Sequence, residues 1–356
     1  MRFRPTYPIV LAADFGAGSP EATQAGRIAL EVADRFIVPA YRSLAEATNT
    51  QAGAWAAFAE ADGEGGIASL RAAYHDTCDA WAHAQIIRTG PIVLFLRYER
   101  FAFWPDARNG TQRALDALMA SDDPDDLLPE HLATNAVAGQ GLTALERILF
   151  DGEGPVAALT ASGDEAARRI NVGLALARNL NGIANEILTD WIADDGMRNA
   201  LVSGNGWNNL FADGDEVARL FLTDLVGAFQ MMHDVKLLPV LGETIDVARP
   251  RLSEAWRSGR AKRDLVGNLE ASQAMSDVFA QHVGEARRAV LDESFDAAAM
   301  ALMTLPDDVG DAAADPERRG QVEAARDAIK ATQLLVAEIL PADLGITLGF
   351  NALDGD

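Results

Sequence analysis

Apolar residues recur along most of this chain at intervals of three and four positions. Alternation at intervals of two, which marks half-buried strands, is rare, and β-branched runs bounded by turn residues are few. Alanine and leucine, both strong helix formers, supply many of the apolar positions. The pattern therefore predicts an all-α fold. The expected long helices cover residues 22–48, 67–88, 111–120, 130–150, 163–196, 214–238, 251–283, 285–304 and 317–340.

Breaks rich in glycine, proline and aspartate separate these helices, and the break near residues 151–165 divides them into two sets. Each set holds about four long helices, the inventory of a four-helix bundle. In both sets a long first helix precedes a second one that ends in proline and glycine, which favours an internal duplication. We therefore expect two four-helix-bundle-like domains, over residues 22–155 and 156–356, preceded by a separate segment over residues 1–21.

Composition supports a folded globule and limits its partners. Hydrophobic residues make up 49% of the 356 and charged residues 23%, so material for a core is ample and the signature of disorder is absent. The 53 acidic and 30 basic residues give a formal net charge of -23, which repels a phosphate backbone, and no nucleic-acid partner is expected. The single cysteine, Cys78, excludes an intrachain disulfide. No stretch approaches the ~20 continuous apolar residues of a membrane span.

The first residues have part of the pattern of an export signal. Arg2 and Arg4 precede the apolar run from Tyr7 to Ala13, which is shorter than the apolar region of a complete signal. We interpret residues 1–21 as an export-signal remnant or a flexible N-terminus, and we expect the protein in the periplasm or elsewhere in the cell envelope.

A carboxylate falls at the edge of an apolar helix face in the segment 130–150. Leu142, Leu145 and Leu149 define the apolar stripe, and Glu146 lies about 40° from Leu142 around the helix. Thr143 shares a face with Glu146, because residues three apart are neighbours on a helix. A carboxylate at such a boundary must be paired, bind a cation or take up a proton, since an isolated buried charge is costly. The alternative to a binding site is a structural salt bridge with an arginine of another helix.

Two titratable residues fall inside the apolar stripe of the helix expected over residues 214–238. His233 and Lys236 lie one turn apart, with Asp234 beside them, and Pro239 and Gly242 follow. Each residue alone is typical of a structural histidine or of a lysine that extends to solvent. Both together predict a polar pocket in the second half.

Two further segments concentrate guanidinium and aromatic groups. In the second-half segment 249–258, Glu254 and Arg257 are three apart on an expected helix, where they can pair. Trp256 lies between the arginines of this segment, Arg249 and Arg257 among them, where its ring can stack or pack. The alternative for these residues is a ladder of surface ion pairs. The first-half segment 97–106 supplies further candidates for a site around Glu146, which are Arg97, Arg100, Trp104 and Asp106.

Known catalytic signatures are missing from the chain. It has no H-E-x-x-H, G-x-S-x-G or P-loop segment, and its five histidines are scattered. His75, Cys78, Asp79 and His83 have helical spacing, but their neighbours indicate a solvated surface rather than a metal site. Spacing alone names no reaction.

Four landmarks in order along the chain carry a family resemblance. The strongest is the segment from Gly139 to Phe150, with Gly141 and Glu146 five apart and an apolar pair and an aromatic at its end. The others are Trp81 with Gly90-Pro91, the run Phe103–Asp106 and the tail Leu348–Asp356. This set resembles the imelysin family, the insulin-cleaving-membrane-protease-like proteins of bacterial envelopes, whose motif is G-x-H-x-x-E. The resemblance implies two helical bundles related by duplication, export, a link to iron or haem uptake and a site between the halves.

One position departs from the family motif, because the motif histidine falls on Thr143. Threonine is a poor metal ligand beside imidazole, and a single carboxylate binds transition metals weakly. The chain therefore resembles family members that keep the glycine and the glutamate of the motif without its histidine, and this resemblance favours a non-catalytic protein over a metallopeptidase.

We hypothesise a binding protein of the envelope linked to iron acquisition, with a polar site between the two bundles. We expect it to bind a small molecule or an iron species. Iron or another divalent metal is the candidate cofactor, and Glu146 is the residue expected to coordinate it. Other envelope iron-uptake proteins are candidate partners. The expected binding residues are Gly141, Thr143, Glu146, Arg97, Arg100, Trp104, Asp106, His233, Asp234, Lys236, Arg249, Glu254, Trp256 and Arg257, with Arg97, Arg100 or Arg249 holding Glu146. The alternatives are a metal-dependent peptidase that uses Glu146 and His233, and an envelope interaction scaffold.

Overall fold

The computed structural model describes residues 23–61 and 66–349 of the chain. Within these ranges the chain forms helices joined by turns, without a strand, and the all-α prediction is confirmed. The expected export-signal remnant over residues 1–21 and the tail motif from Phe350 onward lie outside the described residues. No helix in the described part combines the length and apolar character that a membrane crossing requires.

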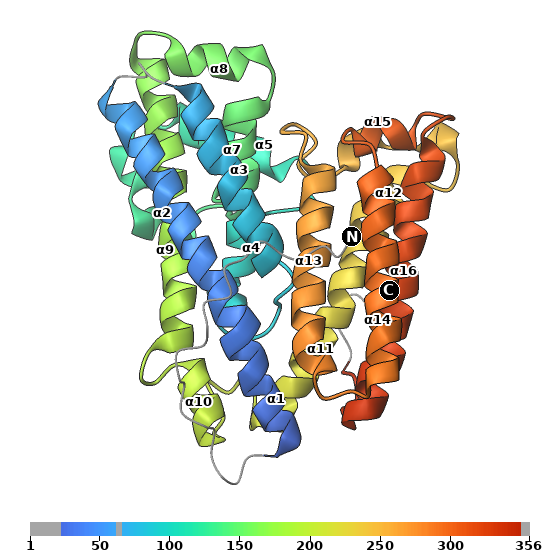
Figure 1. Ribbon diagram of the computed structural model, residues 1–356. Coiled ribbons are helices and arrows are strands. Elements are labelled where there is room, and N and C mark those ends of the chain that lie inside the picture. Colours follow the sequence, from blue (N-terminus) through green and yellow to red (C-terminus); the bar gives the residue numbers. More distant parts are fainter. Residues whose placement is uncertain (1–22, 62–65, 350–356) are drawn as a thin grey trace.

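The first group of long helices packs around α2 (Val38–Glu60), which lies between α3 (Ile67–Ala84) and α9 (Asp164–Ile192) (Figure 1). The shorter α7 (Leu142–Phe150) packs against both α3 and α9. Helices α2 and α9 pack closely at Gly173 of α9, because this residue has no side chain. A Cβ atom there would lie 2.2 Å from the Trp55 ring of α2. The indole of Trp55 is thus buried against α9, where no larger residue fits.

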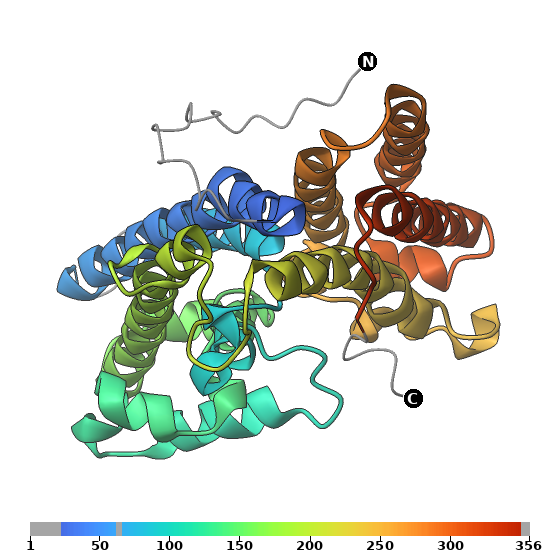
Figure 2. The same ribbon diagram turned by 90° about the horizontal axis from the view of Figure 1, so that it is seen from below.

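The second group contains α11 (Gly214–Gln230), α13 (Ala261–Ala280), α14 (Glu285–Thr304) and α16 (Arg319–Leu344). Helix α16 packs along α14 and also contacts α11. Figure 2 shows the two groups side by side when the molecule is viewed from below. Their interiors form one continuous set of buried apolar side chains.

Two helix contacts between the groups are the most extensive in the described part of the chain. Helix α1 (Gln24–Val32) continues through a π-helical turn, Ala33–Ile37, into α2, but α1 itself packs on α11 of the second group. Two glycines allow this approach, since a Cβ atom on Gly214 would lie 2.9 Å from the Cα of Gly26. The second contact is between α3 and α13, and the candidate site lies beside it.

Short elements connect and cover the long helices. They are α4 (Arg97–Phe101), α5 (Gly110–Ala120), α6 (Pro129–Thr134), α8 (Glu153–Thr160), α10 (Met197–Ser203), α12 (Leu238–Leu241) and α15 (Val309–Ala313). A second π-helical segment, Met231–Leu237, joins α11 to α12.

Two expected helices are interrupted. The segment 130–150 is not one helix, because the chain leaves the helix after Thr134 and starts again at Leu142. The segment 251–283 is helical only from Ala261 to Ala280, since residues 253–260 form a turn that includes Ala255 at a φ of 48°. Both interruptions border the candidate site, where side chains of the irregular segments contact other helices.

Helix contacts do not follow the expected division at residues 155/156. Helix α9 comes after that position, yet it packs along α2 of the first group. The boundary between domains and the internal duplication stay predictions.

Candidate functional site

Gly141 fixes the start of the helix that carries the candidate site. It is the N-cap of α7, and a Cβ atom there would lie 2.2 Å from the carbonyl oxygen of Phe101 and 2.5 Å from that of Arg100. Helix α7 therefore begins directly against the backbone of α4. This contact sets the position of Glu146, which follows just over one turn later.

Glu146 is buried, with only 4% of its surface exposed. Its Oε1 accepts hydrogen bonds from the backbone N–H of Ser258 at 2.9 Å and from the Ser258 hydroxyl at 2.8 Å. Burial raises the pKa of Glu146, while the Ser258 bonds and the nearby Arg257 guanidinium oppose the rise. Both bonds engage Oε1, so the second carboxylate oxygen is available to a ligand.

A cavity of about 40 Å³ lies next to Glu146, between α3 and α7 of the first group and α13 of the second. Its volume accommodates an ion or a few water molecules. Three carboxylates line it, those of Glu146, Glu254 and Asp264. The remaining lining residues are Tyr74, Cys78, Trp81, Ala82, Gln85, Ala102, Trp104, Leu142, Thr143 and Ala255. Both halves of the chain therefore build one cavity, and its polar lining is acidic.

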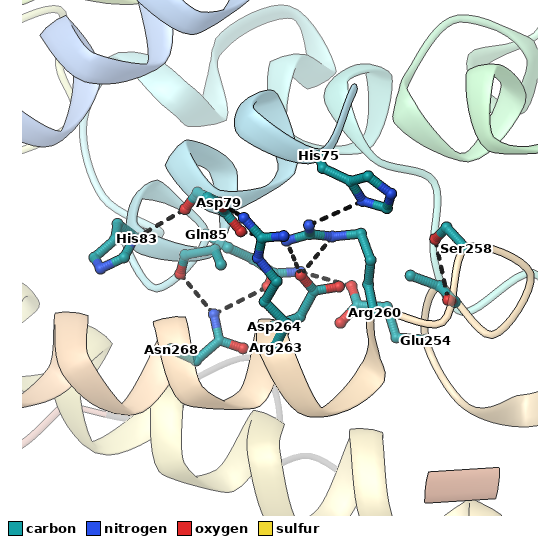
Figure 3. Close-up of polar contacts among 12 residues, drawn as sticks. His75, Asp79, His83, Gln85, Glu254, Ser258, Arg260, Arg263, Asp264 and Asn268 are labelled. Carbon is teal, nitrogen blue, oxygen red and sulfur yellow. Dashed lines mark hydrogen bonds and ion pairs between the residues drawn. The ribbon is translucent and has the colours of Figure 1, made fainter. Parts of the chain in front are cut away.

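Lys236, a residue of the second group, balances part of the negative charge of these carboxylates. Its ammonium donates to Gln85 Oε1 at 2.9 Å and to Asn268 Oδ1 at 2.6 Å, and it forms an ion pair with Glu254. Gln85 also donates through Nε2 to Glu254 at 3.0 Å. Figure 3 shows Gln85, Asn268 and Glu254 facing one another across the two groups. The network holds the end of α3 to α13 and to the 253–260 turn.

A buried arginine forms the second polar connection. Arg260, 1% exposed, donates to Asp264 and to Asp79 Oδ1, each at 2.7 Å, and its Nη1 lies 3.2 Å from His75 Nδ1 (Figure 3). Arg263 contacts the other oxygen of Asp79. Burial raises the pKa of Asp264, and the Arg260 guanidinium opposes that shift. Asp79 thus lies in an interface between helix groups, not on the solvated surface that its neighbours indicated.

Four of the expected binding residues meet at the cavity. Thr143, Glu146, Trp104 and Glu254 all line it. The Thr143 hydroxyl donates to the carbonyl oxygen of Phe103 at 3.2 Å, which anchors the chain segment that carries Trp104.

The arginines expected to hold Glu146 have other partners. Arg97 pairs with Asp190 at 2.6 Å and with Glu186 at 3.2 Å, and Arg100 donates to Gln140 at 2.8 Å. Both arginines are buried, and both contact polar side chains of α9, Arg97 through Asp190 and Arg100 through Asn179. Arg249 is exposed, and its backbone N–H donates to Val240 O at 2.8 Å. The expectation that one of these arginines holds Glu146 is wrong, because Ser258 of the irregular turn takes that place.

His233 and Lys236 point to different places. Lys236 reaches the inter-group network, whereas His233 lies 2.7 Å from Gln333 Oε1 on one ring nitrogen and 2.7 Å from Asp234 Oδ1 on the other. The π-helical segment Met231–Leu237 explains the difference, since its wider turn separates positions that share a face in an α-helix. His233 and Asp234 therefore do not join the cavity.

The remaining candidates lie around the site's edge. Arg257 pairs with Asp151 at 2.9 Å instead of with Glu254, because the expected helix is a turn here. Trp256 packs against the guanidiniums of Arg257 and Arg251, at 4.3 and 5.5 Å from its ring centre. Asp106 caps α5 by accepting from the N–H groups of Gly110 and Thr111.

Sequence reasoning missed Ser258, Gln85, Arg260, Asp264 and Asn268. One local signal was present, the spacing of four between Arg260 and Asp264, which suits an ion pair on a helix. The other three are uncharged residues whose role depends on the helix opposite. In residues 23–61 and 66–349, no group of three or more His, Cys, Asp or Glu side chains is arranged to hold a metal ion. A cation at Glu146 would complete its coordination with water or with atoms of its own chelator.

Asp224 provides a pH-dependent connection between the groups. It is buried in α11 and accepts a hydrogen bond from the Arg88 N–H at 2.9 Å. Burial is the main cause that raises its pKa from 3.8 to about 7. The folded state thus holds this proton more tightly than the unfolded chain, and the contribution of Asp224 to stability is lost as pH rises from about 4 through 7.

Replacing Asp224 by asparagine is expected to remove this loss. The free energy of unfolding of D224N should rise relative to the wild type between pH 5 and pH 8, by up to about 4 kcal/mol for a shift of this size. Urea unfolding at several pH values measures the difference. Asp122→Asn, at an exposed position, is the control and should show no such trend. A pH-independent difference between D224N and the wild type would contradict the assignment.

Solved structures with the same fold are known. An imelysin-like protein from Psychrobacter arcticum 273-4 is similar with a TM-score of 0.72 and 19% identity, over 94% of this chain and 100% of that chain. A "putative iron-regulated protein A precursor" from Parabacteroides distasonis ATCC 8503 is similar with a TM-score of 0.68 and 13% identity, over 93% of this chain and 96% of that chain. No curated protein sequence matches the chain.

A sequence model of the imelysin family matches residues 37–336. The match includes most of both helix groups and every residue that lines the cavity around Glu146. Because it covers most of the chain, the chain belongs to the imelysin family.

Proposed function

We propose that this protein is a non-catalytic binding protein of the cell envelope, linked to iron acquisition, that holds a compact iron species in the cavity beside Glu146. The observation that carries the proposal is the buried carboxylate of Glu146, which has one oxygen engaged by Ser258 and the other available. A carboxylate in this position gains from a cation, because desolvation otherwise penalises its charge.

The lining of the cavity suits a cation and its volume suits a small one. Glu146, Glu254 and Asp264 bring three carboxylates to one space. Lys236 pairs with Glu254 and Arg260 pairs with Asp264, so Glu146 is the carboxylate of the three whose charge a bound cation would balance. A free volume of about 40 Å³ is far below the roughly 300 Å³ or more of pockets for larger organic ligands. An iron ion that keeps water or chelator ligands is therefore a better candidate than haem.

The name of one relative supports the link to iron. The protein from Parabacteroides distasonis is described as iron-regulated and as a precursor, which fits an exported protein. We extend both properties to this chain as part of the proposal, with the periplasm as its location and other envelope iron-uptake proteins as candidate partners.

The peptidase alternative requires Glu146 and a histidine to act on one metal. Thr143 stands where the family motif has histidine, and both ring nitrogens of His233 are engaged by Asp234 and Gln333 in the second group. These contacts favour a binding role. Metal-dependent peptide cleavage that disappears in Glu146→Gln would support the peptidase instead, and a stoichiometric protein partner without any small ligand would support a scaffold.

Glu146→Gln is the direct test of the binding proposal. Glutamine keeps the shape and can still accept the two Ser258 bonds through Oε1, but it removes the negative charge. We expect calorimetry to show micromolar binding of ferric iron, supplied as a weak chelate, to the wild type and a loss of about tenfold or more in E146Q. A charged acceptor is worth that much in a buried site.

The matched control is Glu130→Gln, which removes one charge at an exposed position outside the cavity. It should bind iron like the wild type. Unfolding measurements should show E146Q to be at least as stable as the wild type, because burial penalises the charge that is removed, so a loss of binding cannot be attributed to misfolding. Absence of iron binding by the wild type, or equal binding by E146Q, would refute the proposal.

A further inference from the structure

A second cavity lies on another face of α7, between α7, α5 and α9 of the first group. Its volume is about 330 Å³, which is in the range of small-molecule sites. Glu146 lines the inter-group cavity, and its neighbour Arg147 lines this one. The lining residues are Gln112, Leu115, Asp116, Met119, Ala120, Arg147, Ile148, Asp151, Glu165 and Arg169. The cavity is thus separate from the site proposed for iron.

Arg147 has spare hydrogen-bonding capacity at this cavity. Its side chain is only 10% exposed, and its terminal nitrogens donate to Gln112 at 2.9 Å and to Asn109 at 2.5 Å. Its Nε is buried and has no hydrogen-bond partner. Burial and the nearby Arg257 lower the pKa of Arg147, because its charge is poorly solvated. A bound anion would both satisfy Nε and stabilise the charge.

Arg169 presents the same kind of unused donor from α9. Its Nε is likewise buried without a hydrogen-bond partner, and its one ion pair, with Glu165, is long at 3.8 Å. Two arginines from two helices therefore line one cavity, each with a free Nε–H. Buried donors without partners are rare in folded proteins, and guanidinium groups match carboxylates in geometry.

The lining also contains negative charge, so a simple anion is not the best match. Asp116 and Glu165 are exposed at the rim, and Asp151 already pairs with Arg257 and Arg147. The apolar side chains of Leu115, Met119 and Ile148 complete the walls. A ligand with a carboxylate and an ammonium separated by a short aliphatic chain would satisfy all three kinds of surface.

We propose that the cavity between α5, α7 and α9 binds a small zwitterion of the amino-acid class. Arg147 and Arg169 receive its carboxylate, Asp116 and Glu165 receive its ammonium, and the apolar walls contact its aliphatic part.

Calorimetry with the full chain tests the proposal. The probes are β-alanine and γ-aminobutyrate, which are zwitterions, and the controls are propionate and propylamine, which carry one charge each. The zwitterions should bind at least about tenfold more tightly than either control, since each lacks one of the two charged contacts. Equal binding of propionate and γ-aminobutyrate would overturn the zwitterion assignment, and so would absence of binding by every probe.

Two variants locate the binding. Arg169→Gln removes a donor whose only ion pair is a long one with an exposed partner, and it should weaken γ-aminobutyrate about tenfold or more. Asp116→Asn should weaken γ-aminobutyrate but strengthen propionate, an opposite effect that misfolding does not produce. Arg326→Gln, which removes a partly exposed arginine paired with its exposed neighbour Asp327, is the matched control and should change neither affinity. Unchanged binding in R169Q and D116N would overturn the proposal.

Discussion

Replacing Gly141 by alanine is expected to lower the free energy of unfolding by about 3 kcal/mol, at the upper end for overpacking of a core. The added Cβ would lie 2.2 Å from the Phe101 carbonyl oxygen and 2.5 Å from that of Arg100. Both are backbone atoms, so no side-chain rotation can relieve the overlap, and α7 must move away from α4. Urea unfolding followed by circular dichroism measures the change.

Gly182→Ala is the matched control for this substitution. Gly182 lies exposed within α9, and an added Cβ would meet no atom within 4 Å. Alanine is a better helix former, so G182A should gain about 0.5–1 kcal/mol. If G141A lost no more stability than G182A, the close approach of α7 and α4 would not be a requirement of the fold. G141A should also weaken the iron binding proposed for the cavity beside Glu146, because Glu146 moves with α7.

Replacing Arg260 by methionine is expected to cost about 3–5 kcal/mol at neutral pH, the range for breaking a buried ion pair by removing one partner. Methionine fills much of the aliphatic volume, but Asp264 remains buried in α13 without its cation. Asp79 retains Arg263, so the main penalty arises at Asp264.

The pH dependence of the R260M effect distinguishes a charge effect from a packing defect. Burial already raises the pKa of Asp264, and removal of the Arg260 guanidinium removes the main group that opposes that rise, since Lys236 opposes it less. Protonation at lower pH neutralises the orphaned carboxylate, so R260M should be less destabilised at pH 5 than at pH 8. Arg263→Met is the control, because that side chain is half exposed, and it should cost at most about 1 kcal/mol. A loss in R260M that is equal at both pH values would indicate a packing defect instead.

The candidate site shows where sequence reasoning reached its limit. The position of Glu146 at the edge of an apolar stripe, with Thr143 on its face, indicated a buried polar site, and both residues do line the cavity. The partner of Glu146 was not predictable in the same way. Ser258 lies 112 positions away along the chain, in a segment whose pattern favoured a helix. Local periodicity predicts which residues are buried, but it does not predict which distant residues they contact.

The spacing of His233 and Lys236 illustrates a second limit. Helical counting places both on one face, but the π-helical turn at Met231–Leu237 separates them. A turn of this kind changes one hydrogen-bonding step of the backbone, and counting 3.6 residues per turn along the sequence does not detect it. The interrupted helices at 135–141 and 253–260 were missed as well, and side chains of both segments contact other helices, as Gln140 does with Arg100 and Ser258 with Glu146.

The sequence by itself determined that the chain is all-α and which segments form most of its long helices, and it pointed to the glycine and the glutamate of the candidate site, because these properties follow from local periodicity and from a recognisable motif. Only the tertiary structure decided that Ser258 binds Glu146, that Lys236 and Arg260 join the two helix groups and that Arg147 and Arg169 share a cavity. Those contacts link residues far apart in the chain. They are selected by which helix faces meet, and that depends on the packing of the whole molecule.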